Sequence, residues 1–221
     1  MYAFELIEFT VLVMSCPTKD LISGDKVPVF GLGTWQSKPG EVRSAVKHAI
    51  KVGYRHIDGA ALYFNEKEVG EGIKDALKEN SNLKRNDLFV VSKLMMPDMD
   101  PKYVEQACKQ TLSDLDLEYL DLYLMHWPIA WKNNGKKGPE KLAKNADGST
   151  PLDNDLHPTK TWIAMEDLVK KGLVRNIGVS NFNSKQIEDI IKNGNVSQLH
   201  DVLINYNASK LFKTIIMDLI N

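Results

Sequence analysis

Four polar side chains stand at or just after the ends of predicted strands. Asp58 ends one apolar run, and Tyr63 follows it in the next loop. Lys93 and His126 end two later apolar runs. In proteins built on parallel strands, reactive groups gather at the carboxyl ends of the strands. The spacing therefore predicts one site that combines an aspartate, a tyrosine, a lysine and a histidine.

These four side chains have the chemistry that the reduction of a carbonyl group requires. A hydride donor turns the carbonyl into an alkoxide that needs a proton, and a tyrosine with an ordinary pKa of about 10 is a slow acid. A neighbouring ammonium stabilises the phenolate, and a carboxylate beyond it can hold that ammonium in place. Tyr63, Lys93 and Asp58 supply these parts. His126 can orient the carbonyl by a hydrogen bond.

Two tryptophans, Trp35 and Trp127, stand near these positions and are expected to form apolar walls around a substrate. Taken singly, each polar residue has an ordinary structural explanation: a turn-capping aspartate, a solvated lysine, a half-buried packing tyrosine and a satisfied core histidine. Only their joint placement at strand ends supports the functional interpretation. We expect no metal site.

Short apolar runs alternate with amphipathic helices along the chain. The predicted strands are residues 30–35, 54–58, 88–93, 119–126 and 173–179, and the predicted helices are residues 37–53, 65–77, 100–115, 159–172 and 183–191. A small hairpin is predicted ahead of them, over residues 20–29. Residues 129–157 have no periodicity, and so long a loop usually covers a binding site.

Five strand-helix units in strict alternation predict an α/β fold with a parallel sheet and helices outside it. An open doubly wound sheet and the eight-stranded TIM barrel both fit this order. Polar residues end nearly every strand instead of gathering at one switch point, which favours the barrel. A dinucleotide fingerprint at Gly31 and Gly33 is rejected, because Gln36 occupies the third glycine position.

Three helix starts carry side chains suited to cap them. Ser37 is expected to cap the first helix. Asn65 with Glu68, and Asn183 with Gln186, have the spacing of a capping box at the second and fifth helices.

The bulk composition is that of an ordinary soluble domain. The chain has 221 residues and a formal net charge of −1, so neither nucleic acid nor a membrane is an expected partner. Its two cysteines cannot form a disulfide framework, which favours a reducing, cytoplasmic setting. Residues 1–14 are expected to be an N-terminal extension, and Met1 and Met14 are both candidate starts.

Several blocks of the sequence resemble the signature blocks of the aldo-keto reductases. They are Gly31-Leu-Gly-Thr-Trp35, Gly53-Tyr-Arg-His-Ile-Asp58 with Tyr63, Val91-Ser-Lys93, Leu122-Tyr-Leu-Met-His-Trp-Pro128 and Gly178-Val-Ser-Asn-Phe182. The resemblance covers roughly residues 20 to 195, in order and at the family's spacing. Residues 144–148 and 181–187 look most similar to the NADP-dependent aldehyde reductase branch.

The resemblance implies a TIM (β/α)8-type barrel and the NADPH-dependent reduction of aldehydes or ketones by a monomer. It implies Tyr63 as the general acid, with the other three polar residues completing a tetrad. It also implies a set of cofactor-binding residues: Gly33, Thr34, Trp35, Asp58, Ser180 and Asn181. One departure is local, since Met95 and Met96 stand where the family often has a Trp-Asn pair.

The resemblance ends near residue 195. Residues 202–207 could form a sixth strand, but Tyr206 stands where the family has a glutamine. We therefore expect a barrel portion over residues 15–195, with five to six strand-helix units, and a divergent tail over residues 196–221. A complete barrel takes roughly 250 residues, so a C-terminally truncated isoform is expected.

Two functions remain open from the sequence. An intact tetrad favours the reductase. The resemblance implies that an incomplete barrel would lack the segment with which family members grip the adenosine 2′-phosphate. An incomplete barrel would also expose a sheet edge. That favours a catalytically silent isoform that acts as a binding or regulatory module.

Overall fold

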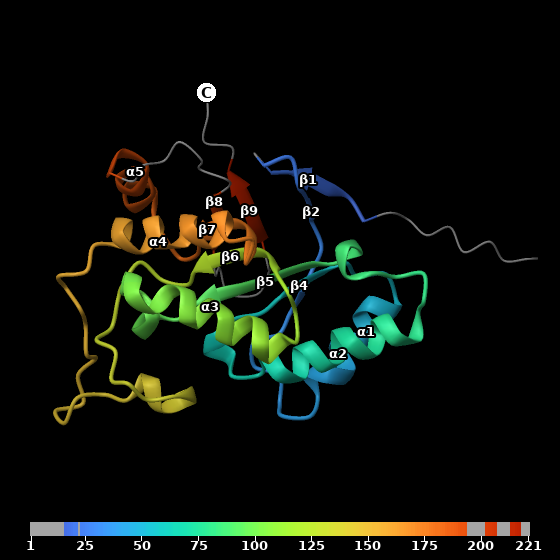
Figure 1. Ribbon diagram of the computed structural model, residues 1–221, viewed down its shortest axis with the longest axis horizontal. Helices are drawn as coiled ribbons and strands as arrows, with labels where there is room; N and C mark the ends of the chain where they lie inside the picture. Colours follow the sequence, from blue (N-terminus) through green and yellow to red (C-terminus); the bar gives the residue numbers. More distant parts are fainter. Residues whose placement is uncertain (1–15, 22, 194–201, 207–212, 218–221) are drawn as a thin grey trace, which may run out of the picture.

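Five parallel strands form the centre of the molecule. The computed structural model describes residues 16–21, 23–193, 202–206 and 213–217 (Figure 1). The sheet has the strand order β3, β4, β5, β6, β7, and every neighbouring pair is parallel. The strands are β3 (Leu32–Gly33), β4 (His56–Asp58), β5 (Phe89–Leu94), β6 (Leu120–Met125) and β7 (Val174–Val179).

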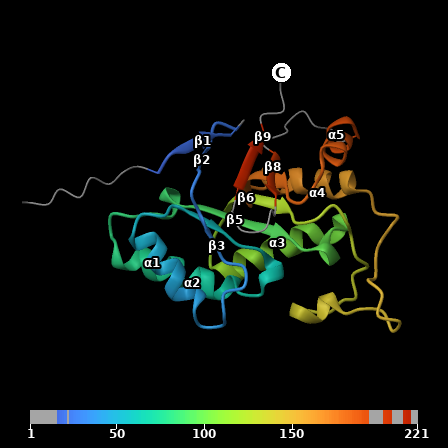
Figure 2. The ribbon, with the colours of Figure 1, turned by 180° about the vertical axis from the view of Figure 1, so that it is seen from behind.

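One helix follows each strand of this sheet. The helices are α1 (Val42–Lys51), α2 (Glu66–Glu79), α3 (Pro101–Leu115), α4 (Pro158–Lys170) and α5 (Ser184–Asn193), and four 3-10 helices join them: η1 (Ala61–Tyr63), η2 (Arg85–Asp87), η3 (Met96–Asp98) and η4 (Gly138–Leu142). Helices α1 and α2 lie side by side in both Figure 1 and Figure 2, as do α4 and α5. The predicted five strand-helix units of a TIM-type barrel are therefore confirmed. None of the helices in the described residues is long and apolar enough to cross a membrane.

The strands divide the core into two parts because alternate side chains point to opposite faces of a sheet. On β5, Val90 and Leu94 belong to the large cluster that the helices cover, whereas Phe89 and Val91 belong to a smaller inner cluster. Lys93 continues the inner series, so its side chain points into the barrel interior. Ser92 points toward the helices.

A hairpin closes the inner cluster at one end. Strands β1 (Thr18–Asp20) and β2 (Lys26–Pro28) pair antiparallel, which confirms the predicted hairpin. Its apolar residues Leu21 and Val27 pack in the inner cluster, and Asp25 accepts a hydrogen bond from Asn176 Nδ2 at 2.8 Å. The hairpin and the η4 loop lie at opposite ends of the molecule in both views (Figures 1 and 2).

Two predicted helix caps are wrong, and one loop explains both. Helix α1 begins at Val42 and not near Ser37, because residues 38–41 form a turn in which Gly40 has a φ of +82°. Asn65 precedes α2, but its Nδ2 donates to the Thr34 carbonyl at 2.8 Å. Glu68 accepts a hydrogen bond from Gly40 N at 2.8 Å. Both side chains of the predicted capping box therefore hold the β3–α1 loop.

The capping box of α5 is confirmed. Gln186 N donates to Asn183 Oδ1 at 3.0 Å, and Asn183 N donates to Gln186 Oε1 at 2.9 Å. Such reciprocal bonds satisfy two backbone donors that a helix start leaves unpaired.

Two further strands are described after α5. They are β8 (Val202–Tyr206) and β9 (Lys213–Met217), which pair antiparallel with each other. The strand over residues 202–206 is thus confirmed, but its predicted place within the barrel sheet is not found: β8 lies beside β7, while its hydrogen-bonded partner is β9. The connection 207–212 is too short for a parallel crossover, which explains the antiparallel pairing. The predicted extension, residues 1–14, and the rest of the predicted tail lie outside the described residues.

Helices α2 and α3 approach each other closely at Gly70. A Cβ atom on Gly70 would contact the carbonyl of Leu115, at 2.6 Å from its carbon. Backbone atoms cannot move aside as a flexible side chain can, so any larger residue would push the helices apart.

Replacing Gly70 by alanine should lower the free energy of unfolding by about 1–3 kcal/mol, because overpacking outweighs alanine's advantage of about 1 kcal/mol in helix propensity. Denaturant unfolding measures this. Lys67→Ala on the same helix is the control, because the Lys67 side chain is 79% exposed, and it should change stability by less than about 0.5 kcal/mol. An unchanged or higher stability of Gly70→Ala would contradict the close approach.

Candidate active site

A buried ion pair joins the ends of β4 and β5. Lys93 is fully buried, and its Nζ donates to Asp58 Oδ1 at 2.5 Å and to the Gly59 carbonyl at 2.9 Å. The Asp58 side chain is 15% exposed. The parallel register places Asp58 opposite Val91, two residues before Lys93 on the same face. A buried ammonium persists only when it is paired and hydrogen-bonded, and both conditions are met here.

Tyr63 lies against this ion pair. It ends η1, in the connection between β4 and α2, and is half-buried. Lys93 Nζ lies 5.3 Å from the centroid of the Tyr63 ring, and the His126 ring meets the same ring edge-on with centroids 5.7 Å apart. The structure therefore brings together the four polar residues that the sequence singled out, at the carboxyl ends of three strands.

The pKa of Tyr63 is raised, whereas a neighbouring ammonium alone was expected to lower it. Burial raises the pKa of this phenol, the Lys93 ammonium lowers it, and the Asp58 carboxylate raises it. The net pKa lies above the ordinary value of 10.0 because burial outweighs Lys93. The phenol is therefore protonated at neutral pH and has a proton to donate.

His126 is a neutral imidazole at this site. Burial, together with the Lys93 ammonium, lowers the pKa of His126 to about 3. Its ring stacks on Trp127 with centroids 6.3 Å apart. Among the described residues, none is a hydrogen-bond partner of the buried His126 Nδ1. A neutral histidine with a free ring nitrogen can orient a carbonyl, but it is not charged to act as a strong acid.

Ser180 and Asn181 follow β7 at the same end of the sheet. Ser180 N donates to the Met125 carbonyl at 2.8 Å. Asn181 has a φ of +64°, which asparagine tolerates better than most residues. Its Nδ2 donates to the His126 carbonyl at 2.8 Å and to Ser180 Oγ at 3.1 Å. The side-chain nitrogen of Asn181 thus already bonds to protein groups, and Oδ1 is the atom that can accept a hydrogen bond from a ligand.

The end of β3 completes this face. Thr34 is fully buried, and both its backbone N–H and its hydroxyl donate to the Asp58 carbonyl, at 3.1 and 3.2 Å. Gly33, the last residue of β3, is half-buried. Trp35 and Trp127 are 54% and 38% exposed, so both indoles present apolar surface to solvent.

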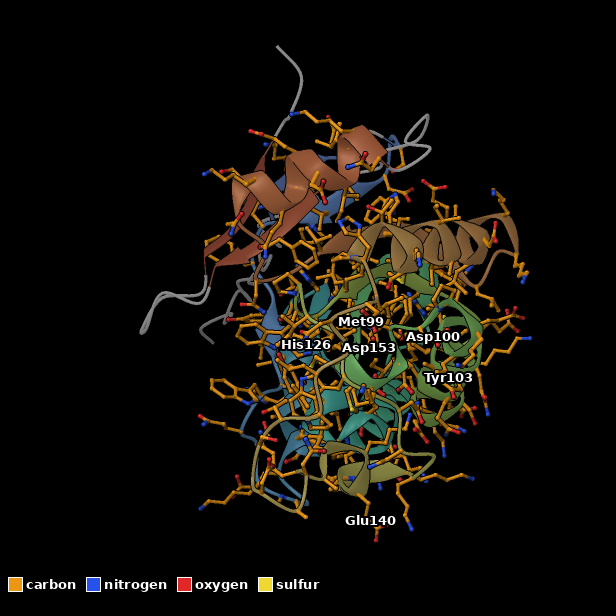
Figure 3. All side chains as sticks on the ribbon, turned by 90° about the vertical axis from the view of Figure 1, so that its left-hand side faces the viewer. Met99, Asp100, Tyr103, His126, Glu140 and Asp153 are labelled. Atoms are coloured by element: carbon orange, nitrogen blue, oxygen red, sulfur yellow. The ribbon has the colours of Figure 1, made fainter. Side chains whose placement is uncertain are left out.

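The long loop after β6 is anchored at the same end. Lys141 Nζ donates to both oxygens of the buried Asp98 carboxylate, at 2.8 and 2.6 Å. Asn133 Nδ2 donates to Asp98 Oδ1 at 3.1 Å, and Trp131 N donates to the Met96 carbonyl at 3.1 Å. Asp98 and Met96 belong to η3, directly after β5, so the loop is tied beside the strand that carries Lys93. Figure 3 shows Glu140 of this loop at one end of the molecule.

Sequence reasoning missed three groups at this end. The Gly59 carbonyl accepts from Lys93, Asn65 holds the Thr34 carbonyl, and Glu66 lies buried behind Ser92. Asn65 and Glu66 look like an ordinary helix start in sequence, because acidic and amide side chains are common there. Only the packing of α2 against β5 shows that both are used elsewhere.

Within the described residues, no group of three His, Cys, Asp or Glu side chains could hold a metal ion. A polar cavity of about 220 Å³ is lined by Asp25, Lys26, Asp121 and Arg175, among others. It lies at the amino ends of β6 and β7, beside the hairpin, and so belongs to the opposite end of the barrel from Lys93.

Known protein families and sequences support the resemblance seen in the sequence. The family model described as "Aldo/keto reductase family" matches residues 29–221. Aldo-keto reductase family 1 member A1 of Pongo abelii is 53% identical over 171 residues, which are 77% of this chain and 51% of that protein. The protein of the same name from Gallus gallus is 49% identical over 80% of this chain and 52% of its own length. The chain therefore spans about half the length of these relatives.

Solved structures agree with the sequence comparison. The aldose reductase of Schistosoma japonicum superposes with a TM-score of 0.79 at 43% identity, covering 86% of this chain and 61% of that one. The Bombyx mori aldo-keto reductase in complex with NADP superposes with a TM-score of 0.71 at 38% identity, covering 82% and 56%. Fold, strand-end residues and family match lead to one conclusion: the chain belongs to the aldo/keto reductase family.

Proposed function

We propose that the chain is an NADPH-dependent oxidoreductase that reduces aldehydes or ketones to alcohols by hydride transfer, with Tyr63 as the general acid. The observation that carries this proposal is the buried Asp58–Lys93 ion pair beside the Tyr63 ring. The family match and the similarity to the aldose reductase of Schistosoma japonicum support the same reaction class. A monomer in a reducing, cytoplasmic setting is part of the proposal.

The residues at the strand ends fit a nicotinamide cofactor. Asn181 Oδ1 accepts from no described residue, and it can accept from a carboxamide N–H. Ser180 can add a second polar contact, while Gly33, Thr34 and Trp35 line the same end of the sheet. The Bombyx mori relative holds NADP in its structure. When bound, NADPH supplies the hydride.

The proton comes from Tyr63. At neutral pH the phenol is protonated, so it can donate to the carbonyl oxygen as that oxygen gains charge. Lys93 then stabilises the phenolate that remains, because its ammonium is held in place by Asp58 and Gly59. Neutral His126 can donate a hydrogen bond to the same carbonyl and fix its orientation.

The first test is cofactor binding by the purified chain. A titration with NADPH, followed by cofactor fluorescence, should give a saturable change. Asn181→Ala should weaken this binding about threefold to tenfold, because one hydrogen bond is lost. Asn82→Ala, on the exposed surface, is the matched control and should bind as the unchanged chain does.

No saturable change at high micromolar NADPH, in a chain that circular dichroism shows to be folded, would contradict the reductase. It would favour the alternative function, a binding or regulatory module.

The second test removes the proposed acid. Tyr63→Phe should lower kcat for aldehyde reduction by roughly 10²–10⁴, the usual contribution of a general acid, and leave NADPH affinity and unfolding free energy nearly unchanged. Tyr103→Phe removes a hydroxyl from the outer helix α3, away from His126 (Figure 3), and should keep full activity. Steady-state kinetics at saturating cofactor measures both. Retained activity in Tyr63→Phe would rule out the assigned acid.

A further inference from the structure

A buried carboxyl group lies behind the active site, on the helix side of β5. Glu66 is the first residue of α2, three residues after Tyr63, and it is 7% exposed. Its Oε1 accepts a hydrogen bond from Ser92 Oγ at 2.6 Å, and its Oε2 accepts one from Thr111 Oγ1 at 3.2 Å. One carboxyl group thus joins α2, β5 and α3.

Neutral hydroxyls are the hydrogen-bond partners of Glu66 in the described part of the chain. A buried carboxylate without a paired cation is costly, so burial favours the protonated form. Burial raises the pKa of Glu66 from its ordinary value of 4.5 to about 7, although the hydrogen bonds from Ser92 and Thr111 lower it. Glu66 therefore changes its charge near neutral pH inside the core.

Strand β5 connects this carboxyl to the active site. Ser92 and Lys93 are adjacent residues whose side chains point to opposite faces of the strand. The Lys93 ammonium lowers the pKa of Glu66, so the two groups interact through the strand. An ionised Glu66 would therefore offset part of the positive charge of Lys93 that faces the Tyr63 ring.

Two other titratable groups that face Glu66, on α3 and β6, have pKa values raised by burial. Burial raises the pKa of Cys108 on α3 to about 12 and the pKa of Tyr123 on β6 well above its ordinary value. His126, on the site side, has its pKa lowered to about 3. The remaining charged neighbour, Asp114 on α3, raises the pKa of Glu66 by its negative charge.

We propose that Glu66 is a positioning residue of the active site: it holds β5 from behind through Ser92, and its change of charge makes the Tyr63–Lys93 pair a stronger or weaker proton donor. The inference rests on the proposed reductase function. With Glu66 protonated, Lys93 acts on the phenolate without a competing anion. With Glu66 ionised, a negative charge behind β5 opposes the phenolate that proton transfer leaves.

The test is the pH profile of aldehyde reduction. The kcat of the unchanged chain should fall about threefold as pH rises through about 7, because Tyr63 becomes a weaker acid. Glu66→Gln keeps the size of the side chain and cannot ionise, so its kcat should stay at the low-pH value across this range. The same fall in Glu66→Gln would overturn the inference.

Ser92→Ala tests the direction in which the midpoint of the pH profile moves. The Ser92 hydrogen bond lowers the pKa of Glu66, so its removal should move the midpoint of the profile to higher pH. A midpoint that stays in place or moves to lower pH would overturn the assignment. Glu79→Gln makes the same chemical change at the exposed end of α2 and should leave the profile unaltered.

Two readouts do not depend on activity. Ultraviolet difference titration against Tyr63→Phe should show a lower Tyr63 pKa in Glu66→Gln than in the unchanged chain. The unfolding free energy of the unchanged chain relative to Glu66→Gln should fall between about pH 4.5 and 7, because the folded state holds this proton more tightly than the unfolded state.

These readouts separate the two proposals. An unshifted Tyr63 titration in Glu66→Gln would overturn the coupling even in an active enzyme. A shifted titration in a chain without reductase activity would support the coupling and count against the proposed function.

Discussion

The ion pair between Lys93 and Asp58 is the interaction on which the rest of the site depends. Removing an ammonium from water carries an effective penalty of several kcal/mol, which only a well-placed anion and further hydrogen bonds offset. Asp58 lies near enough because β4 and β5 are parallel neighbours with Asp58 opposite Val91. A parallel pair requires a crossover, and α2 is that crossover. The helix layer therefore belongs to the site as much as the strand ends do, since it fixes the register that pairs the charges.

Local sequence patterns predicted the repeat of strands and helices and the gathering of polar residues at strand ends, because both follow from periodicity and from parallel strand order. The predictions were wrong where a side chain had more than one possible hydrogen-bond partner. Asn65 and Glu68 have the spacing of a capping box, yet both bond to the loop after β3. Asn183 and Gln186 have the same kind of spacing and do form the box. The difference lies in which loop packs nearby, which is tertiary information that spacing cannot carry.

The pKa of Tyr63 was mispredicted for a related reason. The sequence supplied the neighbouring ammonium, whose effect has the expected sign, but not the depth of the pocket, whose effect is larger. Because burial could not be read from the sequence, Glu66 was missed as well, since its spacing alone predicts a solvated residue at a helix start. Burial acts on both groups in one direction, raising the pKa of the phenol in front of β5 and of the carboxyl behind it. The strand thus separates two acids that keep their protons for the same physical reason and that interact with the same lysine.

Hydrogen bonds also join the carboxyl ends of β6 and β7. Ser180 N bonds the Met125 carbonyl, and Asn181 Nδ2 bonds the next carbonyl, that of His126. The residue suited to meet a carboxamide therefore holds the backbone of the residue suited to orient a carbonyl. Because one amide group makes this link, the position of Asn181 and the backbone position of His126 depend on each other. In the proposed reductase, the contact to the hydride donor and the orientation of its acceptor would therefore both depend on this one amide group.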